Sequence, residues 1–117
     1  MQFDLARLKQ LGDLGTDEGR QWLLEVVDAY IADTRAKYDE MAAALNQRNS
    51  VLVQALAHEQ KGVSAMLGAE VMAGHFRAIE DGPGNQPVVR DHLSEILASL
   101  DQLHSEIHVL TSSPPSK

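Results

Sequence analysis

Apolar residues recur at three- and four-residue steps along most of the chain, which is the spacing of one face of an α-helix. The longest run predicts a helix from about residue 17 to residue 45. Its expected buried stripe consists of Leu23, Val27, Tyr30, Thr34, Tyr38, Met41 and Leu45. A second regular run after Pro87 predicts a final helix. Its seam consists of Val89, Leu93, Ile96, Leu100, Leu103, Ile107 and Leu110.

Two shorter helices are expected between these long ones. The first begins at an Asn49 or Ser50 cap and ends where Gly68 interrupts the pattern. Its buried face reads Val53, Leu56, then Gln60 or Val63, and Leu67. The second carries Ala69, Met72, Phe76 and Ile79 at helical spacing. The Gly- and Pro-rich stretch 81–87 then separates it from the last helix.

A short amphipathic helix is predicted over residues 4–11, with Gly12 ending it and Thr16 capping the long helix that follows. Its apolar residues, together with the residue before it, are Phe3, Leu5, Leu8 and Leu11. We expect it to pack on a second, partial stripe of the long helix, formed by Trp22, Val26 and Ala29. The alternative is that part of this stripe stays exposed as a docking patch.

Because short connections force neighbouring helices to be antiparallel, the expected fold is all-α: an up-down-up-down four-helix bundle with a short extra N-terminal helix. Residues 1–111 form this single domain, and residues 112–117, which include two prolines, form a disordered tail. Hydrophobic residues make up 44% of the chain, enough for a core, but only 4% are aromatic. Aliphatic residues must therefore fill that core.

Charge and composition restrict the possible partners and compartments. A formal net charge of −7 argues against a nucleic-acid backbone or an anionic membrane as partner. The absence of Cys excludes disulfides and thiolate chemistry. No apolar run approaches the ~20 residues that span a bilayer, and the N-terminus does not resemble a signal peptide. We expect a soluble, cytoplasmic protein.

The candidate chemistry lies around His58. Since a helix advances about 100° per residue, His58, Lys61, Gly62 and Ala65 share one strip. The strip lies away from the set Val53, Leu56, Val63 and Leu67. The strip offers an imidazole, a cation one turn on, and two residues with almost no side chain. A helix-interior glycine costs roughly 0.5–1 kcal/mol relative to Ala, so a close approach of another helix or of a partner is expected here.

This pattern resembles the histidine phosphotransfer (HPt) domain family. The family signature is a His followed by Lys-Gly at the third and fourth positions, a small Ser or Ala at the sixth, and Gly-Ala further on. The matching residues are His58, Lys61, Gly62, Ser64, Gly68 and Ala69. The resemblance covers roughly residues 14–110. Two positions depart from it: Gln60 stands where the family usually has an apolar residue, and Glu59 places a carboxylate beside the histidine.

The resemblance implies a phosphorelay intermediate and not a kinase. His58 would accept a phosphoryl group from a receiver-domain aspartate and pass it to another response regulator, and Lys61 would screen the added charge. Gly62 and Ala65 would receive the receiver domain, and Ser64, Gly68 and Ala69 would serve close helix packing. The partners would be receiver domains and a hybrid sensor histidine kinase. The Mg²⁺ would come from the receiver, with no cofactor of the chain's own.

Two other readings stay open. The bundle could be an interaction module that binds a receiver or sensor kinase through the Gly62 surface without being phosphorylated. In either case, we expect partner choice to lie in the first half of the long helix, including Val26, Ala29 and Asp33, together with the N-terminal helix. It could also be a metal-binding bundle, since His104 and His108 have a chelating spacing. No third ligand is visible in the sequence, so we predict no metal site. A monomer is expected, and the sequence does not separate a stand-alone protein from one domain of a kinase.

Overall fold

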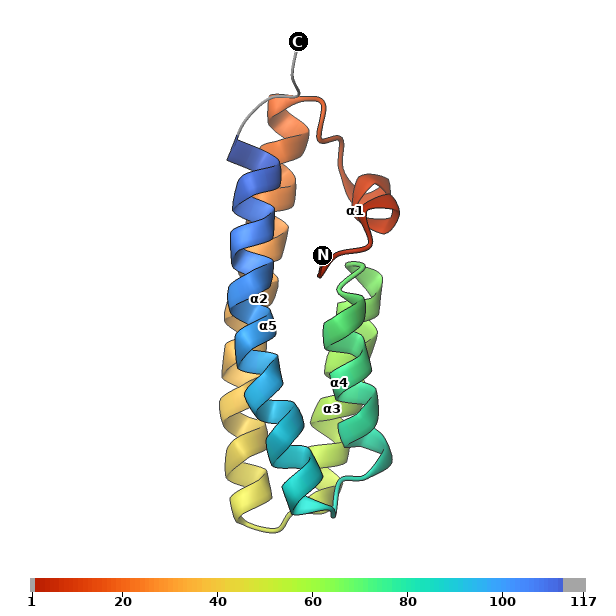
Figure 1. Cartoon of the computed structure of the whole chain (residues 1–117), viewed down its shortest axis with the longest axis vertical. Coiled ribbons are helices and arrows are strands. Elements are labelled where there is room, and N and C mark those ends of the chain that lie inside the picture. The colour runs from red at the N-terminus through yellow and green to blue at the C-terminus, as the bar shows by residue number, and fades with distance from the viewer. Residues whose placement is uncertain (1, 113–117) are drawn as a thin grey trace.

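The computed structural model describes residues 2–112, which form five helices in the order that the sequence predicts (Figure 1). Their bounds are α1 Leu5–Leu11, α2 Asp17–Asn46, α3 Ser50–Met66, α4 Glu70–Asp81 and α5 Gln86–Ser112. Within the described residues, the only β pairing is an isolated antiparallel bridge between Phe3 and Ala69. The predicted all-α class is therefore confirmed.

Helices α2 and α3 begin at the expected side-chain caps. The Thr16 hydroxyl accepts a hydrogen bond from the Gly19 amide at 3.0 Å, and the Asn49 side chain accepts one from the Leu52 amide at 3.2 Å. Each cap satisfies one of the backbone N–H groups that a helix start leaves without an intrahelical partner. Local sequence thus determines where both helices begin.

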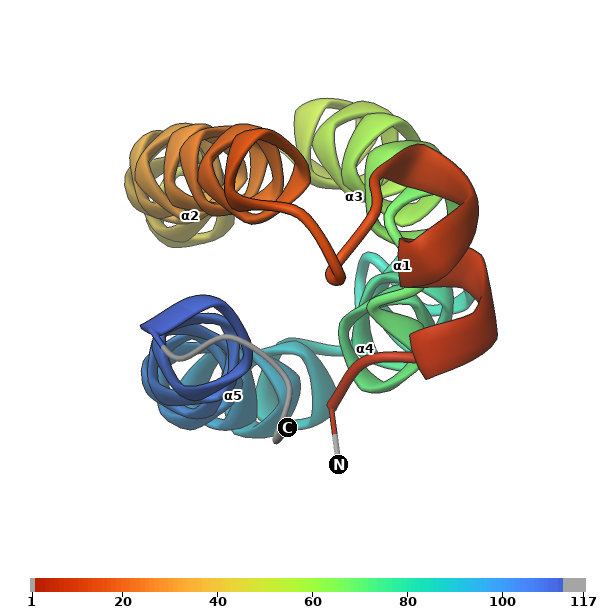
Figure 2. The ribbon, with the colours of Figure 1, turned by 90° about the horizontal axis from the view of Figure 1, so that it is seen from above.

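The four long helices form an antiparallel ring. In Figure 1, α2 runs down the long axis, α3 returns, α4 descends and α5 returns again. Helix α2 packs on α3 and α5, and α4 packs on the same two neighbours. Viewed along the axis in Figure 2, α2 and α5 lie on one side of the ring and α3 and α4 on the other. The Cα extents of 53 × 18 × 18 Å reflect this rod-like up-down-up-down bundle.

The core follows the predicted stripes with three differences. Tyr38 and Leu110, expected in the core, are half-buried at its margin. Of the two alternatives that the sequence left open on the buried face of α3, Val63 is 36% exposed. Gln60 and Ser64 are buried instead, because successive steps of four from Leu56 lead to these two positions.

The expected packing of α1 on Trp22, Val26 and Ala29 is wrong. Trp22 is 46% exposed and Ala29 is exposed, so part of this stripe lies on the surface, as the alternative proposed. Helices α2 and α5 extend beyond α3 and α4, and α1 lies beside that extension (Figure 1). There Leu8 is fully buried, in the same core as Leu23 on the inner stripe of α2. The N-terminal helix therefore adds its buried residue to the core on the inner face of α2, and the outer face with Trp22 stays exposed.

The N-terminal segment is attached to the turn between α3 and α4. The Asp4 amide donates a 2.7 Å hydrogen bond to the Gly68 carbonyl, beside the Phe3–Ala69 bridge. At the opposite end of the chain, Ser112, assigned to the disordered tail by the sequence, is the last residue of α5. The rest of that predicted tail, residues 113–117, lies outside the described residues.

Two polar pairs cross the core between α2 and α3. The Tyr30 and Ser64 hydroxyls share a 2.5 Å hydrogen bond, and the Thr34 hydroxyl donates to the Gln60 side-chain oxygen at 3.1 Å. Burial raises the pKa of Tyr30, while hydrogen bonds from Ser64 and Thr34 partly oppose that rise. The side-chain nitrogen of Gln60 is buried and has no hydrogen-bond partner among the described residues. Gln60, which stands where the family usually has an apolar residue, is thus a core residue with a desolvated amide.

We predict that Gln60→Leu stabilises the protein by about 1 kcal/mol, because it removes the desolvation cost of the unpaired amide nitrogen at nearly constant volume. The Thr34 hydroxyl loses its acceptor, but a helical threonine can turn to a carbonyl of the preceding turn. Urea unfolding followed by circular dichroism measures the change. A loss of stability in Gln60→Leu would show that the Thr34–Gln60 bond outweighs the unpaired nitrogen.

Candidate functional site

The His58 side chain projects from the outer face of α3 and is 69% exposed. Its neighbours on the opposite face, Leu56 and Ala57 among them, are buried in the bundle. The Nδ1 atom of His58 lies 2.5 Å from Oε2 of Glu80, which comes from the adjacent helix α4. The ring is therefore held from one side by a partner on a second helix, while most of the imidazole remains open to solvent.

Glu80 holds His58 and Lys61 at the same time. Its second oxygen, Oε1, accepts a hydrogen bond from Lys61 Nζ at 2.5 Å. The Glu80 side chain is 17% exposed, whereas the side chains of the two residues that it binds, His58 and Lys61, are 69% and 29% exposed. The hydrogen bond from Lys61, and then that from His58, holds the pKa of Glu80 below its usual 4.5. The carboxylate thus stays charged at neutral pH, and the stability it contributes is lost only as pH falls through that lowered pKa.

The arrangement selects one tautomer of the imidazole. A carboxylate can only accept hydrogen bonds, so its contact with Nδ1 places the ring proton on that nitrogen. In the neutral ring, the lone pair then lies on Nε2. The contact therefore orients His58 as a nucleophile that would react through Nε2.

The predicted strip beside His58 is bare. A Cβ placed at Gly62 would have no atom of the described residues within 4 Å, apart from its own helix backbone and chain neighbours. The glycine is exposed and Ala65 is partly exposed. Contact with another bundle helix therefore does not explain Gly62 in this part of the chain, and the surface is open to an approaching partner.

Ser64, Gly68 and Ala69 lie away from the exposed imidazole, in packed surroundings. Ser64 is buried against Tyr30, as described above. Gly68 has a φ of +77°, a conformation that favours glycine, and a Cβ there would lie 3.0 Å from Cβ of Arg7. Ala69 is fully buried. Two of the three positions therefore lie against the N-terminal segment, Gly68 beside Arg7 and Ala69 beside Phe3.

The carboxylate of Glu59, next to His58 in sequence, is directed toward α2. Its Oε1 atom lies 3.7 Å from Nζ of Lys37, a residue of α2. Lys37 therefore partly offsets the negative charge that Glu59 places next to His58 in the sequence. The carboxylate that contacts His58 is Glu80.

Glu80 is the site residue that sequence reasoning missed. No local motif marks it, since 22 residues and a turn separate it from His58. A signal was nevertheless present: both residues lie the same number of positions from Ala69, where the chain reverses between α3 and α4. Antiparallel pairing about that turn brings the two positions to the same level of the bundle.

The family comparison agrees with this geometry. The family model described as Hpt domain matches residues 25–106, which is more than half of the chain. The chain belongs to the Hpt-domain family. Hpt domains carry out histidine phosphotransfer in two-component phosphorelays, where they interact with receiver domains and kinases.

The matched range includes every residue of the candidate site and excludes α1. No curated protein and no solved structure gave a match. Among the described residues, none of the helices has the length and apolar character that crossing a bilayer requires.

Proposed function

We propose that this Hpt domain is a phosphorelay intermediate whose phosphoacceptor is His58. It would take a phosphoryl group from the aspartyl phosphate of a receiver domain, downstream of a hybrid sensor kinase, and pass it to the receiver of a response regulator. The observation that carries the proposal is the contact between His58 Nδ1 and Glu80 on an otherwise exposed imidazole. It leaves Nε2 as the nucleophile on the side open to a partner.

In the accepting step, the Nε2 lone pair of His58 attacks the phosphorus atom. The N–P bond forms, the P–O bond to the aspartate breaks, and the aspartate leaves as a carboxylate. No proton has to move, because the Nδ1 proton stays in its hydrogen bond to Glu80. The positive charge that develops on the ring lies beside the Glu80 carboxylate, which stabilises it. The reverse sequence returns the phosphoryl group to a second receiver.

Lys61 offsets the charge that the reaction adds. By analogy with other phosphoryl groups, the transferred group carries about −1.5 to −2 charges at neutral pH. Lys61 is held one turn from His58 by Glu80, which keeps the ammonium near the ring. We expect this cation to weaken the repulsion between the new group and Glu80.

The receiver would supply the rest of the catalysis, including Mg²⁺ and the in-line geometry. Its active-site edge would approach over Gly62 and Ala65, where no side chain longer than a methyl group intervenes. We infer that the domain works as a monomeric phosphocarrier without kinase activity of its own. Ser64, Gly68 and Ala69 contribute by keeping α3 in place.

The test is a two-step transfer. The protein is incubated with a receiver domain carrying labelled aspartyl phosphate, and label on the protein is then examined for the acid-labile, base-stable behaviour of a phosphohistidine. Addition of a second, unlabelled receiver should remove that label. Failure of the wild-type protein to take up label from several receivers would support the interaction module instead.

We predict that Glu80→Gln slows transfer about tenfold, because a neutral amide stabilises the charged ring less and releases Lys61. The matched control is Glu59→Gln, which removes a neighbouring carboxylate that pairs with Lys37. Initial rates with a single receiver compare the variants.

A second measurement identifies Glu80 as a positioning residue. The ¹⁵N chemical shifts of the His58 ring report the tautomer: Nδ1–H should dominate in the wild type and in Glu59→Gln. In Glu80→Gln a mixture of tautomers is expected. Unchanged shifts and an unchanged rate in Glu80→Gln would contradict the role.

A further inference from the structure

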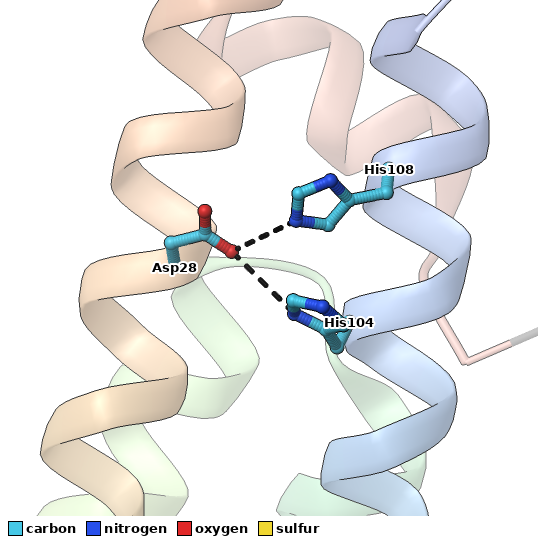
Figure 3. A group of neighbouring side chains, drawn as sticks. All are labelled: Asp28, His104 and His108. Atoms are coloured by element: carbon cyan, nitrogen blue, oxygen red, sulfur yellow. Dashed lines mark ion pairs between the residues drawn. The ribbon is translucent and has the colours of Figure 1, made fainter.

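A second group of metal-binding side chains lies between α2 and α5. Asp28 on α2 faces His104 and His108, which are one turn apart on α5 (Figure 3). Oδ1 of Asp28 lies 3.8 Å from Nδ1 of His104 and 3.5 Å from Nε2 of His108. The sequence showed the two histidines but not the carboxylate that the fold brings to them.

The three ligand atoms lie close together, and the two separations from Oδ1 of Asp28 are nearly those that one metal ion would require. All three lie within 4.8 Å of one another. In a tetrahedral zinc site with bonds of about 2.0–2.1 Å, neighbouring ligand atoms are roughly 3.3 Å apart. The two oxygen–nitrogen separations exceed that value by a few tenths of an ångström. The side chains are about half exposed, so small torsional changes can close the difference.

We propose that Asp28, His104 and His108 bind a divalent transition-metal ion, and that this ion is Zn²⁺. Two imidazole nitrogens and one carboxylate oxygen are a donor set typical of zinc, and three protein ligands leave a fourth position for water or for a partner's side chain. The two histidines lie on one helix at i and i+4, so the backbone already places both rings on the same face.

This site is separate from the phosphotransfer chemistry. It joins α2 to α5, whereas His58 and Glu80 join α3 to α4, and Figure 2 shows the two helix pairs on opposite sides of the bundle. A bound ion would fasten α2 to α5 near the end that α3 and α4 do not reach. Because binding favours the folded state, the ion should raise the melting temperature.

The other group of possible ligands, His75, His92 and Glu95, is less suited to a metal ion. Nδ1 of His75 lies 3.0 Å from Nδ1 of His92, a hydrogen-bond distance at which one ring must present a proton and not a lone pair. A variant in this group therefore serves as the control for nonspecific binding of Zn²⁺ to surface histidines.

The experiment is a calorimetric titration of the metal-free protein with Zn²⁺. One equivalent should bind to the wild type. Asp28→Asn keeps both histidines and the shape of the carboxylate, and His108→Gln removes one ring. Each variant should weaken binding at least about tenfold. His92→Gln removes the competing group and should leave the affinity within about twofold.

Two further readouts examine the site independently. The visible spectrum of bound Co²⁺ should change in Asp28→Asn but not in His92→Gln, and Zn²⁺ should raise the melting temperature of the wild type only while Asp28 is present. The proposal is overturned if the wild type binds no Zn²⁺ at micromolar concentrations. It is equally overturned if Asp28→Asn binds as tightly as the wild type, or if His92→Gln abolishes binding.

Discussion

His58→Gln is expected to abolish phosphorylation of the protein by a phosphorylated receiver, a loss of more than about 10³-fold. Glutamine is polar and close to histidine in size, but its amide nitrogen has no available lone pair and cannot attack phosphorus. The fold should be unaffected, because the His58 side chain is 69% exposed and its known contact is with Glu80 at the surface. Initial transfer rates and the final amount of label measure the effect.

The controls for this prediction are the other histidines. His104→Gln and His92→Gln remove rings on α5 and should take up label as the wild type does. Circular dichroism should show the same helical content in all three variants. Undiminished label on His58→Gln would place the phosphoacceptor elsewhere and refute the proposed function, whereas loss of label in His104→Gln would show that a second ring takes part.

The largest expected effect on stability is that of Phe76→Ala, at about 3–5 kcal/mol. Phe76 lies on α4 and is 1% exposed, in a core with few other aromatic side chains. Truncation removes most of the buried ring and leaves a cavity that the surrounding aliphatic residues fill only in part. Since small domains are stable by only about 5–15 kcal/mol, this loss is a substantial part of the total.

Urea unfolding measures the change, with Val71→Ala as the matched control. Val71 is on the same helix but is 40% exposed, so its truncation should cost less than about 0.5 kcal/mol. The dependence of the unfolding free energy on urea should be similar in both variants if each still unfolds in one cooperative step. A loss below about 1 kcal/mol in Phe76→Ala would mean that the core around α4 is looser than its burial indicates.

Much of the fold could be predicted because its determinants are local. The stripes on α2 and α5 repeat at helical spacing, and the Thr16 and Asn49 caps act on amides only three residues ahead. The bare strip around Gly62 was equally visible, since residues three and four positions apart always share a helical face. The one ambiguous face, Gln60 or Val63, was resolved by packing against α2.

The sequence by itself determined the helices, their caps, and the strip that presents His58 beside Lys61. Only the tertiary structure decided which carboxylates meet the histidines: Glu80 at His58, and Asp28 at His104 and His108. It also decided that α1 lies beside the extension of α2 and α5, with Leu8 in the core and Trp22 exposed. The reason is physical. Helical periodicity relates residues within one turn, whereas a pairing between helices depends on the register in which two whole helices pack, and turns and core volume set that register.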